Sequence, residues 1–140
     1  MLEVHINYLA ILVSAIIMFG LGALWYSPVM FAKPWLSSLG KTGEQLQEDA
    51  RQRSMFLTFG LSFVAYFVMA FVISHVIDYA AAKTLSDGLR TGFWLWLGLV
   101  ATTALVLSLF ESRSLRLYLI DMGYHLVGML IMGGILAVWA

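Results

Sequence analysis

Cysteine is absent from the 140-residue chain, so disulfides, thiolate metal sites and cysteine nucleophiles are excluded. Charge is also scarce: charged residues make up 11% of the sequence, and 8 basic residues balance 8 acidic ones. A chain without net charge has no basic field to attract nucleic acid, so we exclude nucleic-acid binding. The sequence has instead 61% hydrophobic residues, a share that lies outside the range of soluble domains and is typical of a polytopic membrane protein.

Catalytic motifs are missing as well. The chain has no nucleophile-elbow sequence of a serine hydrolase and no glycine-rich loop that cradles phosphate. No constellation supplies a nucleophile, a base and oxyanion donors together. An enzymatic function is therefore the least favoured interpretation, and we expect no cofactor.

Four apolar segments cover residues 6–27, 55–79, 89–110 and 115–139. Each is long enough to cross a bilayer, which takes about 20 mostly apolar residues at helical rise. The N-terminus lacks the basic residues of a signal peptide, so we expect the first segment to remain as a membrane helix. A polar stretch at 42–53 has acidic residues early and arginines late, as a short helix prefers. These features predict one transmembrane domain over residues 1–140: an all-α, integral membrane four-helix bundle with a short amphipathic or polar helix between the first two spans.

The distribution of basic residues predicts the orientation of the chain. Six of them lie in the first and third loops, whereas the second loop has two, and basic residues favour cytoplasmic loops. We therefore expect both termini on the non-cytoplasmic side of a bacterial inner (plasma) membrane. The six are Lys33, Lys41, Arg51, Arg53, Arg113 and Arg116, and the two are Lys83 and Arg90.

The fourth span opens with three polar residues, Asp121, Tyr124 and His125, whose i, i+3, i+4 spacing places them on one face of a helix. Asp121 lies roughly 7 Å and His125 roughly 13 Å into the membrane, counted from the preceding arginine. Tyr26 and Glu111 arrive at the same cytoplasmic rim, and these five residues form the predicted inner cluster. A carboxylate beside an imidazole suits a proton relay or an ion-binding pair. The alternative is a network of hydrogen bonds that fastens helices together, and both interpretations stay open.

The second span ends with the same three residue types at the same spacing, in His75, Asp78 and Tyr79. They lie at the opposite surface, where they can meet His5 and Asn7, and these five residues form the predicted outer cluster. A metal site of His75, Asp78 and His5 falls short of a recognised ligand set. A structural role is the simpler interpretation, and Asn7 is placed to cap the first helix.

The stretches Ile6-Asn7-Tyr8, Gly22-Ala23-Leu24-Trp25-Tyr26-Ser27-Pro28 and Phe31-Ala32-Lys33-Pro34-Trp35 carry a resemblance. With the ending Met132 to Ala137, the chain resembles a family of small membrane proteins described as a domain of unknown function, number seventeen sixty-one. The resemblance spans essentially the whole length. It implies a four-helix membrane architecture, but no activity, cofactor or catalytic residue.

Two functional hypotheses follow. The first is a small oligomeric channel or transporter with its polar site in the cytoplasmic half. The alternative is a structural or accessory membrane protein whose polar residues fasten helices or partners. We expect the lipid bilayer and further copies of the chain as partners, because four short spans bury little surface and small residues let helices of neighbouring chains approach closely. The glycines considered for this contact are Gly88 with Gly92, and Gly128, Gly133 and Gly134.

Overall fold

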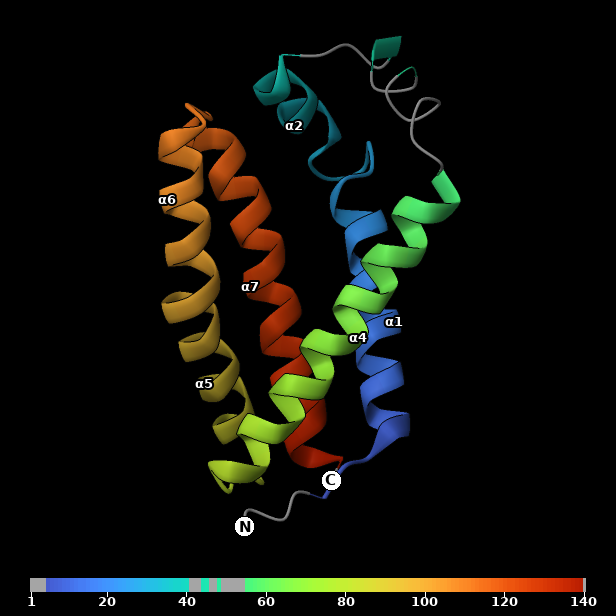
Figure 1. Ribbon diagram of the computed structural model, residues 1–140, viewed down its shortest axis with the longest axis vertical. Coiled ribbons are helices and arrows are strands. Elements are labelled where there is room, and N and C mark those ends of the chain that lie inside the picture. Colours follow the sequence, from blue (N-terminus) through green and yellow to red (C-terminus); the bar gives the residue numbers. More distant parts are fainter. Residues whose placement is uncertain (1–4, 41–43, 46–47, 49–54, 140) are drawn as a thin grey trace.

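The computed structural model describes residues 5–40, 44–45, 48 and 55–139 (Figure 1), and within these ranges the chain is helical and contains no strand. Four units are long and apolar enough to cross a membrane, which confirms the predicted all-α architecture with four membrane helices. The helices are α1 (Tyr8–Trp25), α2 (Ala32–Leu39), α4 (Met55–Tyr79), α5 (Leu85–Leu95), η1 (Trp96–Ala101), α6 (Thr102–Phe110) and α7 (Leu115–Val138).

The third unit is the continuous helix formed by α5, η1 and α6, and η1 is a π-helical turn within it. The loop between the first two spans includes α2, where the sequence shows an interfacial segment. The predicted polar helix over 42–53 lies outside the described residues, apart from Glu44, Gln45 and Glu48. Large apolar side chains such as Leu61, Val68 and Leu107 face outward, so the surface of the spans is compatible with contact with lipid.

Helix α7 is the centre of the bundle (Figure 1): the α5–α6 unit lies on one side of it, and α1 and α4 lie on the other. Half of its most apolar 18 residues are buried, compared with 28% for α1 and less for the other spans. Ile11 and Met18 of α1 and Met132 of α7 are fully buried, so the space between these helices is filled. The other spans therefore pack against α7, and these contacts fix the positions of their inward-facing side chains.

Side chains cap the starts of three helices and so fix where the spans begin. The Asn7 side chain accepts a hydrogen bond from the Ala10 N–H, as its position predicts, and its amide donates to the Trp139 carbonyl at 2.9 Å. This second bond places both ends of the described chain at one end of the bundle. Thr84 caps α5, which begins at Leu85, four residues before the start predicted for the third span. Ser114 caps α7 in the same way.

Helices α5 and α7 pack backbone against backbone through glycines. A methyl group added at Gly88 would collide with the carbonyl oxygen of Gly133, and one added at Gly92 would collide with that of Met129. Gly128 and Gly134 face Met18 and Leu85 in the same chain. The glycines that the sequence offered for contact between chains therefore form contacts within one chain, and they present no free face to a second copy.

We expect Gly88→Ala to destabilise the protein by about 1–3 kcal/mol, because the new methyl group forces α5 away from α7. Thermal unfolding followed by circular dichroism in mild detergent measures the change. Gly98→Ala is the matched control, since Gly98 belongs to the same span and has no neighbouring atom within 4 Å of an added Cβ. Equal melting temperatures for the two variants would contradict the packing described for α5 and α7.

Candidate functional site

Tyr26 and Asp121 form the central contact of the predicted inner cluster. The Tyr26 hydroxyl donates a hydrogen bond to Asp121 Oδ1 at 2.6 Å. Tyr26 is the residue that ends α1, where its backbone N–H donates to the Gly22 carbonyl, and Asp121 lies in the second turn of α7. Both side chains are partly buried. An ionised acceptor and a phenol make a short, charge-assisted bond, so this contact holds the end of α1 against α7.

Tyr124, which the spacing placed on one face with Asp121 and His125, pairs with the backbone of α1. Its hydroxyl donates to the backbone carbonyl of Met18 at 2.6 Å, across the interface between α7 and α1. Gly22 makes room for it, because a Cβ there would lie 2.9 Å from the Tyr124 oxygen. The rings of Tyr26 and Tyr124 meet edge to face with centroids 5.7 Å apart. Tyr26, Asp121 and Tyr124 are therefore brought together around the contact of α1 with α7.

His125 lies beside this group, and its imidazole pairs with the backbone. Its Nδ1 lies 2.9 Å from the carbonyl oxygen of Asp121. A carbonyl only accepts hydrogen bonds, so Nδ1 carries the proton, and Nε2 is the nitrogen left for another partner. The side-chain partner of Asp121 is thus Tyr26, whereas His125 packs its ring on Tyr124 at 5.0 Å between centroids.

Glu111 lies at the turn between α6 and α7, half exposed, and forms an ion pair with Arg113 at 2.7 Å. It shares with Asp121 a cavity of about 160 Å³, here called the rim cavity. Its other lining residues are Ala104, Leu107, Ser108, Arg113, Leu117, Tyr118 and Met122. Glu111 and Asp121 therefore face the same small space. Thr102 and Thr103, at the start of α6, are exposed and donate to carbonyls of their own helix.

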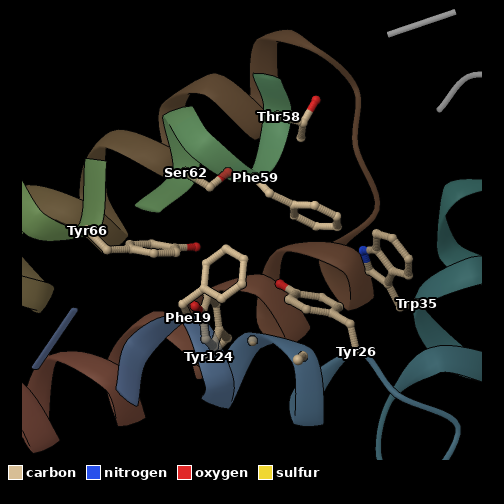
Figure 2. Close-up of a pocket in the computed structure, with 10 residues that line it drawn as sticks. Phe19, Tyr26, Trp35, Thr58, Phe59, Ser62, Tyr66 and Tyr124 are labelled. Atoms are coloured by element: carbon tan, nitrogen blue, oxygen red, sulfur yellow. The ribbon is translucent and has the colours of Figure 1, made fainter. Parts of the chain in front are cut away.

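A larger cavity of about 320 Å³ lies between α1, α4 and α7 (Figure 2) and is here called the aromatic cavity. Tyr26 and Tyr124 belong to its wall, so the Tyr26–Asp121 bond joins the wall of the aromatic cavity to the wall of the rim cavity. The other lining residues are Phe19, Gly22, Ala23, Trp35, Thr58, Phe59, Ser62 and Tyr66.

Sequence reasoning missed the part of this wall that comes from α2 and α4. Ser62 and Tyr66 interrupt the apolar sequence of the second span four residues apart, which places them on one face of that helix, and this spacing was the available signal. Nothing in the sequence indicates that this face turns toward Tyr124. Trp35 of α2 packs on Tyr26 with ring centroids 5.0 Å apart.

The outer cluster separates into two groups at the opposite end of the bundle. His5, Asn7 and Asp78 line a cavity of about 20 Å³, with room for about one water. His75 turns away from it: its Nδ1 pairs with the Phe71 carbonyl at 2.8 Å, and its ring meets that of Tyr79. Within the part of the chain that the structure describes, no three acidic or histidine residues gather as metal ligands would.

The two clusters are far apart along α7. Trp139 lines the outer cavity and lies 18 residues after Asp121, which corresponds to about 27 Å along a helix. The two trios of similar residues therefore belong to separate places in the fold.

Comparison with known proteins identifies the family. No curated protein and no solved structure matches the chain. A family model described as "Protein of unknown function (DUF1761)" matches residues 9–137, which include all four membrane helices except the first residue of α1 and the last of α7. The match confirms the resemblance carried by the Trp-Tyr-Ser-Pro stretch and the Met132 to Ala137 ending. The chain belongs to the DUF1761 family of proteins of unknown function.

Proposed function

We propose that this protein is a small oligomeric membrane transporter whose polar site is the Tyr26–Asp121 contact. The observation that carries the proposal is the position of that contact, since one hydrogen bond joins the walls of two cavities. In this proposal the Tyr26 ring turns away from Asp121, which breaks the hydrogen bond between them, and the movement connects the two cavities. The distribution of basic residues supports a position of this site in the cytoplasmic half of the membrane.

The cost of a carboxylate at this position supports a functional role. Asp121 is partly buried in a membrane helix, and ionisable side chains there are costly and mark pathways for substrates or protons more often than simple packing. His125 follows one turn later. Its Nδ1 contacts the Asp121 carbonyl, and Nε2 takes no part in that contact. The two groups together suit a site at which a proton moves when a substrate binds or leaves.

The packing of a single chain supports an oligomer. Beyond Tyr124, the interface of α1 with α7 is closed by Ile11, Met18 and Met132, each of which is at most 1% exposed. Beyond Tyr124, a transport path therefore does not run between α1 and α7 of one chain. In our proposal the remaining part of the path forms between copies.

A structural or accessory role is the second candidate, and a specific observation favours it. Indole and phenol groups of four aromatic residues donate to backbone carbonyls across helix interfaces, which is how polar groups fasten membrane helices. The four bonds are Trp25 to Ile120 at 3.0 Å, Trp96 to Met122 at 3.0 Å, Tyr118 to Ala101 at 2.7 Å and Tyr124 to Met18 at 2.6 Å. In this alternative, Asp121 is one more fastener.

The transport proposal predicts that Asp121→Asn lowers flux by about tenfold or more, because asparagine keeps the hydrogen bond from Tyr26 and removes the charge. The assay uses proteoliposomes that contain a pH-sensitive dye and receive gradients of Na⁺, K⁺ and small ammonium ions in turn. We expect a change of luminal pH above that of empty vesicles with at least one ion, and a reduced change in Asp121→Asn and His125→Ala. Asp87→Asn, at the opposite end of the bundle, is the control that keeps wild-type flux. Flux absent with every ion, or equal in wild type and Asp121→Asn, would overturn the proposal.

Stability measurements separate the two candidates. We expect Tyr124→Phe to lower the free energy of unfolding by about 0.6–1.7 kcal/mol, because the Met18 carbonyl loses its donor inside the membrane. Asp121→Asn is expected to change it by less than about 0.5 kcal/mol, since the amide oxygen still accepts from Tyr26. Unfolding in mixed detergent micelles measures both. A loss in Asp121→Asn as large as that in Tyr124→Phe, with unchanged flux per folded protein, would favour the accessory role.

A further inference from the structure

The aromatic cavity has a wall of unusual composition. Of the ten described residues that line it, six are aromatic and none of the ten carries a charge; the six are Phe19, Tyr26, Trp35, Phe59, Tyr66 and Tyr124. They come from α1, α2, α4 and α7, so the site exists only when the bundle is assembled (Figure 2). The volume of about 320 Å³ lies within the range of cavities that hold small molecules, about 300–1,000 Å³.

The phenol groups turn this wall into an electron-rich surface. A phenol hydroxyl can donate one hydrogen bond. Tyr26 donates its hydrogen bond to Asp121, and Tyr124 donates its hydrogen bond to the Met18 carbonyl. The remaining capacity of both oxygens is to accept. Figure 2 shows the Tyr66 hydroxyl directed into the same space. Ring faces carry negative charge density as well, so a ligand in this cavity meets π faces and the acceptor positions of Tyr26 and Tyr124. The wall also includes the hydroxyls of Thr58, Ser62 and Tyr66 and the indole N–H of Trp35, which are able to donate.

The wall adjoins a negatively charged side chain at Tyr26. Asp121 lies directly behind Tyr26, and the bond between them pushes electron density into the phenol. Among the residues that the structure describes, no lysine or arginine lines the aromatic cavity, and Arg113 is paired with Glu111 on the rim cavity. In the low dielectric of a membrane protein, a carboxylate one side chain away raises the local preference for positive charge.

From these observations we propose that the aromatic cavity binds a small organic cation, an ammonium ion with apolar substituents. This inference rests on the proposed function and names the class of substrate. A quaternary or tertiary ammonium group suits ring faces within about 6 Å, and its substituents fill the apolar remainder of the wall. An anion would lie close to the carboxylate of Asp121, and a small metal ion would lose water ligands that the five hydroxyl-bearing residues of the described wall do not replace in full.

Equilibrium dialysis of the full chain in lipid nanodiscs tests the inference with benzyltrimethylammonium as the probe. The uncharged isostere neopentylbenzene has the same shape, with carbon in place of nitrogen, and empty nanodiscs supply the background. We expect saturable binding of the cation at one site per chain and binding of the isostere at least about tenfold weaker. Equal binding of the two probes, or no saturable binding above empty nanodiscs, would overturn the inference.

Variants locate the site. We expect Asp121→Asn to weaken cation binding by about tenfold and to leave the isostere unchanged, because only the charged probe senses the carboxylate. Tyr66→Leu removes a ring, and we expect it to weaken binding of the cation by a similar factor. Tyr66→Phe keeps the ring, and we expect its affinity for the cation to lie within about threefold of that of the wild type. Asp87→Asn is the matched control for loss of an acidic charge. Cation affinity unchanged in both Asp121→Asn and Tyr66→Leu would place the probe elsewhere and refute the site.

The outcome is independent of the flux assay. Saturable cation binding in a protein that shows no flux would overturn the transport proposal and retain the cation site. Flux of an inorganic ion without binding of the organic cation would retain the transport proposal and overturn the cation site.

Discussion

The structure depends on the fact that hydrocarbon offers no hydrogen-bond partner, so every backbone polar group in a span must be satisfied within the protein, and polar side chains find partners on neighbouring helices. Helix α7 shows the consequence most clearly. Along its first turns, Tyr118 and Tyr124 donate to carbonyls of the helices on its two sides, and Trp96 donates back to Met122. Each bond fixes a distance and a rotation between two helices. The bundle is thereby held by directional contacts in a solvent where apolar burial between helices gives little driving force.

The two sides of α7 are built differently, and the difference leaves room for the aromatic cavity. Toward α5 the contact is made by glycines, so backbones touch and no space remains. Toward α1 and α4 the contact is made by large rings. Helix α4 begins far from α7 and crosses toward it along its length (Figure 1). Rings of Phe19, Phe59 and Tyr66 span this diverging region incompletely, and the aromatic cavity is the space that they leave.

The sequence allowed the architecture to be predicted because its signals are local. Span length, the cap at Asn7 and the composition of the loops each depend on a few neighbouring residues. The partners of the polar residues were less accessible, since helical spacing fixes a face and leaves open the rotamer and the neighbouring helix. Asp121 and His125 share a face as predicted, yet the imidazole reaches the backbone carbonyl one turn back and the carboxylate reaches Tyr26. The glycines of α5 and α7 illustrate the same limit, because a small residue indicates close approach without naming the partner.

The nature of the Asp121 side chain bears on the choice between the two proposed roles, a fastener and a binding site. A carboxylate has about four acceptor positions. The carboxylate of Asp121 accepts a side-chain hydrogen bond from Tyr26. An asparagine would accept the same bond with a smaller desolvation cost, because burying a neutral amide costs less than burying a charge. Fastening α1 to α7 alone therefore does not call for an ionisable group. The proposed cation in the aromatic cavity gives a reason for an ionisable group. A bound cation offsets the cost of burying the Asp121 charge, and the cost returns when the cation leaves.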